Sequence, residues 1–283
     1  MPRSIRRQVW YARINRRHRT LLDREFKEEA LTAFDADVSA ERYGRTWRLS
    51  QPIVEPGLLV AKLGFERRSP SAGVRYDNSI HDFVEVENPI EAGNFVFFAL
   101  DLETRLLAFE ERKPDIKMQS FIGALTKIFD NQGFLWDIDL ITDDTSLDDW
   151  LSDVDKVTRF RATVSSPNPN PWRHANEINE IISEPNTDIL SIEALAGEDN
   201  QDGIKVEGTI LGAIADHALD GNGYLKLTGL KGGARRFYDS IKRLATSQIV
   251  LDPNGTSDEL VEQLRNAIIV AVSSFKSRKP DVE

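Results

Sequence analysis

The 283-residue sequence contains no cysteine, only four histidines and no long apolar run. Without cysteine the chain has no disulfide, no thiolate nucleophile and no cysteine-ligated zinc or iron–sulfur centre. His18, His81, His174 and His217 lie far apart, which argues against a histidine-based metal site. The longest apolar runs are far shorter than the ~18 residues that cross a bilayer. We therefore expect a cytoplasmic protein with no membrane partner.

The sequence also lacks the common catalytic motifs. There is no G-x-S-x-G nucleophile elbow, no G-x-G-x-x-G dinucleotide loop, no Walker A sequence and no kinase set. We therefore favour a binding protein that needs no cofactor over an enzyme.

The length allows one large domain or two of ordinary size, and a hydrophobic content of 40% can fill their cores. Short apolar alternations interleave with segments of helical periodicity, which predicts an α+β fold. We expect two α/β-type units with mixed, largely antiparallel sheets. Because aspartates and turn residues cluster near 145–156, we place an N-terminal domain at 1–145 and a C-terminal domain at 156–283.

Several elements have clear sequence signals. The connection LET between 95–101 and 105–111 predicts a hairpin, and the alternation in 134–141 predicts a strand. Thr256 with Glu259 forms a capping box that starts the last helix. The other expected strands are 8–14, 58–65, 81–87, 157–164, 187–195 and the segments around Trp47, Tyr224, Phe237 and Ile249; the other expected helices are 20–34, 114–131, 146–154, 172–183 and 209–220.

Seven arginines and no acidic residue occupy the first 22 positions of a chain whose net charge is −10. Arginines next to aromatic rings suit phosphate contacts combined with base stacking. The alternatives are that these arginines lie on a solvated strand edge, or pair with the aspartate-rich stretch 130–155. The candidate residues for binding nucleic acid or an acidic protein partner are Arg7, Trp10, Arg13, Arg16, Arg17 and Arg19.

A second basic segment runs from 226 to 243 and includes Lys231, Arg235 and Arg236. Its glycines at 229, 232 and 233 would let backbone N–H groups approach a phosphate. The same glycines also suit the tip of a two-stranded hairpin, which we favour. The loop 165–171, SSPNPNP, is either a ligand loop or, as we favour, a rigid connector with Trp172 as an anchor.

A metal-dependent nuclease or related phosphoryl-transfer enzyme is the catalytic alternative. Asp137 and Asp139 share one face of a strand, so both carboxylates could reach one Mg²⁺ or Mn²⁺ ion. A second set combines Glu91 with Glu111 and Lys113. We take Glu91 rather than Asp101 as the partner of Glu111, because Asp101 and Glu111 would lie at opposite ends of the hairpin, roughly 20 Å apart. The alternative for the two aspartates is a solvent-facing strand edge.

Residues 156–172, KVTRFRATVSSPNPNPW, together with 217–233, HALDGNGYLKLTGLKGG, resemble a pattern in poorly characterised bacterial proteins of phage-resistance and mobile loci. The resemblance covers only the C-terminal half and carries no catalytic residues. It implies a bacterial cytoplasmic protein with a role in antiviral defence.

These observations predict a cytoplasmic interaction protein that engages nucleic acid or an acidic protein partner through its arginine-rich surfaces. Besides the nuclease, a homo-oligomeric scaffold or a subunit of a larger complex stays open.

Overall fold

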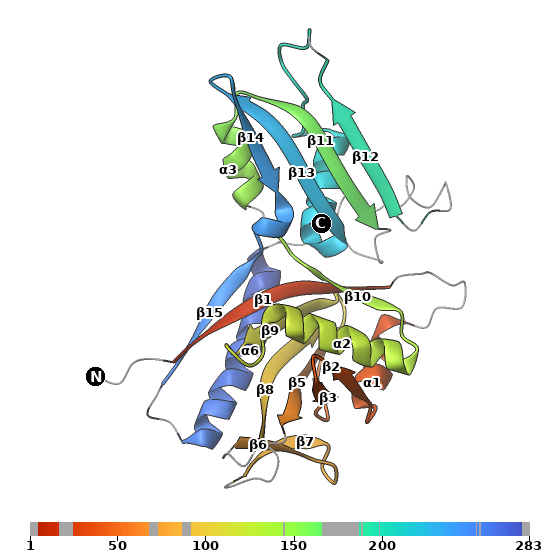
Figure 1. Ribbon diagram of the computed structural model, residues 1–283, viewed down its shortest axis with the longest axis vertical. Coiled ribbons are helices and arrows are strands. Elements are labelled where there is room, and N and C mark those ends of the chain that lie inside the picture. The colour runs from red at the N-terminus through yellow and green to blue at the C-terminus, as the bar shows by residue number, and fades with distance from the viewer. Residues whose placement is uncertain are drawn as a thin grey trace. The chain divides into compact units, whose positions relative to one another are not determined.

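The computed structural model describes residues 5–16, 25–67, 73–86, 92–143, 145–165, 187, 189–197, 199–252, 254 and 256–278 (Figure 1). They form two compact units. Unit 1 combines the described residues up to Ile138 with those from Thr246 onward, and unit 2 comprises those from Asp139 to Ala245. The expected second domain ran from 156 to 283. In the structure, the strand and helix after Ala245 pack with the first unit.

Unit 1 is built on an eleven-stranded sheet whose main path runs β10-β1-β9-β8-β5-β3-β2, with β15 beside β1, β4 beside β5, and β6 between β7 and β8. Ladder pairings such as β1–β9 and β5–β8 are antiparallel. The strands are β1 (Ile5–Arg16), β2 (Ser39–Arg42), β3 (Arg45–Leu49), β4 (Ile53–Glu55), β5 (Leu58–Arg67), β6 (Gly73–Asp77), β7 (Asp82–Val86), β8 (Ala92–Asp101), β9 (Leu106–Glu111), β10 (Trp136–Leu140) and β15 (Thr246–Leu251).

Three helices pack on this sheet: α1 (Phe26–Asp35), α2 (Met118–Gln132) and α6 (Ser257–Arg278). Phe121 of α2 stacks on Phe109 of β9 with ring centroids 4.1 Å apart, and it meets Phe98 of β8 edge-on. The buried face of α2 consists of Phe121, Ala124, Leu125, Ile128 and Phe129. Gly133 ends α2 in the left-handed conformation, as its position predicts.

The last helix, α6, begins with the expected capping box. The backbone N–H of Thr256 donates to a Glu259 carboxylate oxygen at 2.8 Å, and the N–H of Glu259 donates to the Thr256 hydroxyl at 3.3 Å. Further along, Phe275 stacks on Tyr11 of β1 with centroids 4.2 Å apart. None of the described helices combines the length and apolar character that crossing a bilayer requires.

Unit 2 contains a four-stranded antiparallel sheet in the order β12-β11-β13-β14. Its strands are β11 (Lys156–Ser165), β12 (Ile189–Leu195), β13 (Gly223–Lys231) and β14 (Ala234–Asp239). Two helices, α3 (Thr145–Asp153) and α5 (Ile210–His217), share one hydrophobic core with Phe160, Leu225 and Tyr238. Both helices therefore pack on the same face of the sheet (Figure 1).

The expected α+β class with largely antiparallel sheets is confirmed. The hairpin of β8 and β9 turns at residues 102–104, as the short connection predicts. Thr209 occupies the N-cap position of α5, but its side chain makes no capping bond; its hydroxyl instead donates to the carbonyl of Val206 at 2.7 Å. The loop 165–171 and the helix expected at 172–183 lie outside the described residues, apart from Ser165.

Candidate functional site

Three of the predicted binding arginines, Arg7, Arg13 and Arg16, are engaged within unit 1. Their strand, β1, is an interior strand because it pairs with β9 on one side and with β15 and β10 on the other. Arg13 is only 4% exposed and donates to the carbonyl of Thr104. Arg16 pairs with Glu29 at 2.7 Å, and the Nε of Arg7 lies 3.8 Å from a carboxylate oxygen of Glu110.

This arrangement differs from the alternatives of a solvated strand edge and of pairing with 130–155, because Glu110, Glu29 and the carbonyl of Thr104 hold these guanidinium groups. The indole of Trp10 likewise donates to the carboxylate of Glu111 at 3.3 Å. Arg17 and Arg19 lie outside the described residues.

The described candidates for a metal-dependent enzyme do not form a metal site. Glu111 is buried and accepts the backbone N–H of Met118 at 3.2 Å, while Lys113 pairs with it at 3.1 Å. Asp137 and Asp139 lie on β10 as expected, but no group of three carboxylates or histidines suited to a metal occurs among the described residues. Glu91 lies outside those residues.

The predicted hairpin tip joins β13 to β14. Gly232 and Gly233 both have positive φ, 55° and 80°, which is typical of a tight two-residue hairpin turn. The N–H of Gly232 donates to a carboxylate oxygen of Asp155 at 2.7 Å, and Lys231 pairs with Asp153. Because an acidic side chain already occupies the N–H group of Gly232, this turn is a poor phosphate cradle.

The register of the strands separates the basic residues of the 226–243 segment between the two faces of the sheet. Arg236 lies opposite Gly229 and Lys231 opposite Ala234, on the face that carries α3. Arg235 lies opposite Leu230, and Lys226 opposite Asp239, on the other face. Of the three predicted binding residues Lys231, Arg235 and Arg236, only Arg235 therefore lies on the face opposite α3 and α5.

We call the face of the four-stranded sheet that α3 and α5 leave uncovered the open face. Directly opposed residues in antiparallel strands point to the same side, so the register of the strands defines rows of side chains. Three rows cross the open face: Ser191, Thr163 and Tyr224; Glu193, Arg161, Lys226 and Asp239; and Leu195, Arg159, Thr228 and Phe237.

Large side chains are exposed on the open face. Phe237 is 68% exposed, and Leu195 is exposed to the same extent at the far end of its row. Tyr224 is partly exposed, and the ammonium of Lys226 lies 5.8 Å from its ring centroid. Several large exposed apolar side chains on one sheet face, here Phe237, Leu195 and Ile189, are typical of a contact surface.

The charges on the open face favour an anion. Arg159 pairs with Glu193, and Lys242 lies 3.9 Å from Asp239, so both carboxylates of the middle row have a cationic neighbour. Arg161, Lys226 and Arg235 are exposed and make no ion pair with any residue that the structure describes. Within the part of the chain that the structure describes, no carboxylate pairs with these three cations, which suits a surface that meets negative charge from a ligand.

The two sequence segments with the bacterial resemblance meet at one end of the two central strands, where β11 ends and β13 begins. His217 donates through Nε2 to the carbonyl of Ser165 at 3.0 Å, and Ser165 donates to the carbonyl of Asn222 at 3.2 Å. Asn222 in turn donates to the carbonyl of His217 at 3.3 Å. These polar residues of HALDGNG are buried and hold the sheet together, which makes their role structural.

Sequence reasoning missed Arg159, Arg161, Tyr224 and Lys226 as members of one surface. Alternation in VTRFRATV and YLKLTG already separates them from the apolar residues of the same strands. What the sequence does not show is that both helices pack on the apolar side.

A comparison with curated proteins finds no match. A family profile described as "Domain of unknown function (DUF4747)" matches residues 78–268, more than half of the chain. The matched segment includes all of unit 2 and both stretches, 156–172 and 217–233, that resemble poorly characterised proteins. The chain therefore belongs to this family, the domain of unknown function DUF4747.

Proposed function

We propose that the protein binds single-stranded nucleic acid on the open face of the unit 2 sheet. The observation that carries this proposal is Phe237, a largely exposed aromatic ring on a sheet face with three cations that have no ion-pair partner among the described residues. Single strands are bound elsewhere by this combination: cations track the phosphates and aromatic rings stack on the bases.

The cations supply the phosphate contacts. Arg161 and Lys226 lie opposite each other at the centre of the sheet, and Arg235 lies on the neighbouring strand β14. Cationic side chains that neutralise phosphates release condensed counterions, so binding through them weakens as salt rises. The chain as a whole carries a charge of −10, which opposes nonspecific binding elsewhere on the surface.

The aromatic residues favour single strands over duplex. Tyr224 lies two rows from Phe237 and one strand away, which places their Cα atoms roughly 14 Å apart at ~3.3 Å per residue and ~4.8 Å between strands. Successive bases along one strand of a duplex are only ~3.4 Å apart and stacked on each other. Bases that cover both rings must therefore be separated from their stack, which a single strand allows.

An acidic protein partner would also meet the three cations. Exposed aromatic rings also occur at protein interfaces. We favour nucleic acid because Phe237 and Tyr224 lie beside the basic row on a four-stranded sheet, the arrangement on which single-stranded bases stack. The resemblance of 156–172 and 217–233 to proteins of phage-resistance loci supports, as part of the proposal, a role in bacterial antiviral defence in the cytoplasm.

The test is fluorescence anisotropy of the full chain with labelled oligothymidine, oligouridine and a mixed-sequence duplex, in the presence of a chelator. We expect the single strands to bind more tightly than the duplex. Phe237→Ala should weaken single-strand binding at least about fivefold, because stacking on one aromatic ring contributes roughly 1–3 kcal/mol per base. The matched control is Ile80→Ala, which removes an exposed apolar side chain from unit 1.

A charge variant completes the test. Lys226→Gln should weaken binding to every oligonucleotide, whereas Lys205→Gln, an exposed lysine in the loop before α5, should not. Equal binding by Phe237→Ala and the parent protein, or tighter binding of the duplex, would refute the proposal. Cleavage of the oligonucleotides after Mn²⁺ is added would instead favour the nuclease alternative.

A further inference from the structure

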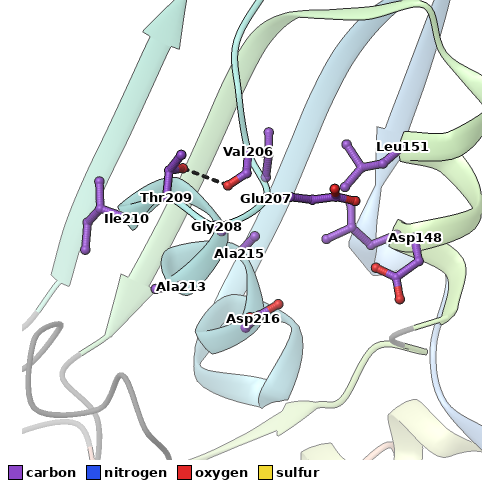
Figure 2. A pocket seen from close by; sticks show the side chains of 12 residues that line it. Asp148, Leu151, Val206, Glu207, Gly208, Thr209, Ile210, Ala213, Ala215 and Asp216 are labelled. Atoms are coloured by element: carbon purple, nitrogen blue, oxygen red, sulfur yellow. Dashed lines mark hydrogen bonds between the residues drawn. The ribbon is translucent and has the colours of Figure 1, made fainter.

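The covered face of the unit 2 sheet contains a pocket of about 690 Å³ between α3 and α5 (Figure 2). Its walls come from α3, from the turn at 206–209 and from α5. The pocket exists because α5 presents small residues to α3: Gly212, Ala213 and Ala215 line it. Gly212 has no room for a side chain, since a Cβ there would lie 2.8 Å from the carbonyl oxygen of Val206.

The floor of this pocket is apolar. Leu147 and Leu151 lie one helical turn apart on α3, and Val206 and Ala213 approach from the other side. Ile210, at the start of α5, is 44% exposed at its edge. The floor is continuous with the hydrophobic core of unit 2, which contains Leu147, Val206 and Ala213.

The rim of the pocket carries only negative charge. Figure 2 shows Asp148 of α3, Glu207 of the turn and Asp216 of α5 around the opening, and all three are exposed. The twelve lining residues include no lysine, arginine or histidine. Asp149 adds to the negative charge of α3, whereas Asp153 is paired with Lys231. The carboxylates of the pocket rim thus lie on the face opposite Arg161, Lys226 and Arg235.

From this arrangement we infer that the pocket docks a cationic amphipathic helix of a partner protein. Apolar side chains of the partner would contact Leu147, Leu151 and Ile210, and its lysines or arginines would lie beside Asp148 and Glu207. Helix-in-groove recognition uses apolar anchors on one helical face, with flanking charges that select the partner. α5, at eight residues, is about 12 Å long and would accommodate roughly two turns of such a helix.

Three synthetic peptides test this inference against the full-length protein by fluorescence anisotropy. The first is a helix-forming peptide of leucine and lysine with leucines at i, i+3, i+4 and i+7. In the second, glutamate replaces every lysine, and in the third, serine replaces every leucine. We expect only the first to bind well, because the pocket requires both an apolar face and positive charge.

Variants locate the binding. Asp148→Lys combined with Glu207→Lys should weaken binding of the leucine–lysine peptide at least tenfold, and Ile210→Ser should weaken it severalfold. The control, Asp199→Lys with Asp202→Lys, reverses two exposed charges outside the pocket and should leave affinity almost unchanged. Urea unfolding of each variant verifies that it is folded.

Equal binding of the leucine–lysine and serine–lysine peptides would refute the inference, because it would indicate attraction to negative charge alone. Equal loss of affinity in the pocket variant and its control would also refute it. The pocket variants should bind oligothymidine like the parent protein. The proposal for the pocket and the proposal for the open face can therefore be refuted separately.

Discussion

Arg161 on β11 lies directly opposite Lys226 on β13, so two cations face each other at the centre of the open sheet face. Like charges in directly opposed positions of a sheet destabilise it. Each cation also has a carboxylate on its other side, but Glu193 beside Arg161 pairs with Arg159, and Asp239 beside Lys226 lies 3.9 Å from Lys242. Both carboxylates are thus shared with another cation. A pair that costs stability and adds nothing to the core fits a role in binding.

This relationship predicts opposite effects on stability and on binding. Lys226→Thr removes the repulsion and places a residue of high strand propensity on β13. We expect the free energy of unfolding, measured with urea, to rise by a few tenths of a kcal/mol. Affinity for oligothymidine should fall in the same variant. A variant that is both less stable and unchanged in affinity would contradict this view of the pair.

Glu110 makes the stability of unit 1 depend on pH. Burial raises its pKa above the ordinary value of 4.5, although the N–H of Phe97, donating at 2.9 Å, and the nearby Arg7 act in the opposite direction. Because the pKa is higher in the folded than in the unfolded chain, the stabilisation is complete below pH 4.5. It is lost as the pH rises through the folded-state pKa.

Glu110→Gln keeps an oxygen to accept the Phe97 N–H but cannot ionise. Urea unfolding between pH 4 and pH 8 should therefore show a smaller decline in the variant than in the parent protein as the pH rises. Glu28→Gln changes an exposed carboxylate of α1 and should leave the decline in place. Identical pH profiles of unfolding for Glu110→Gln and the parent would show that Glu110 does not cause the pH dependence.

Gly93 is required where β8 approaches both β5 and β6. A Cβ at this position would overlap the carbonyl oxygen of Phe65 and lie 2.8 Å from that of Val74. Backbone atoms in two ladders cannot move independently, so Gly93→Ala should destabilise the protein by about 1–3 kcal/mol. Gly197→Ala is the control, because nothing lies within 4 Å of a Cβ there. A chemical-denaturation midpoint as high for Gly93→Ala as for Gly197→Ala would show that the sheet relaxes around the methyl group.

Local patterns in the sequence predict local structure well in this chain. Alternation in 134–141 predicts β10, on which Trp136 and Ile138 are buried, and the Thr256–Glu259 pair correctly predicts the start of α6. Both signals depend only on residues that are neighbours in the chain. Thr209 shows the limit of such signals. It occupies the N-cap position of α5, but its hydroxyl lies within hydrogen-bond distance of the carbonyls of Lys205 and Val206 and makes no capping bond.

The limit between the two units and the burial of β1 depend on pairing between strands that are far apart in the sequence. Tyr11 donates or accepts a hydrogen bond with Ser247 at 2.7 Å, 236 residues later, and no sequence pattern links β1 to β15. Because β15 and α6 join unit 1 through this pairing, a domain limit drawn from composition alone could not include them. Pairing with β9 on one side and with β10 and β15 on the other makes β1 an interior strand, and Arg13 is buried although its segment reads as a basic surface.

The salt dependence of binding counts the cations that contact phosphates on the open face. If Arg161, Lys226 and Arg235 each neutralise one phosphate, the logarithm of the binding constant for oligothymidine should fall with the logarithm of salt with a slope near −2, at roughly −0.7 per contact. Each single substitution to glutamine should make the slope shallower by about 0.7. Phe237→Ala should weaken binding without changing the slope, because stacking releases no counterions. Anisotropy titrations at four or more salt concentrations measure both quantities, and a slope that Arg235→Gln leaves unchanged would remove β14 from the phosphate path.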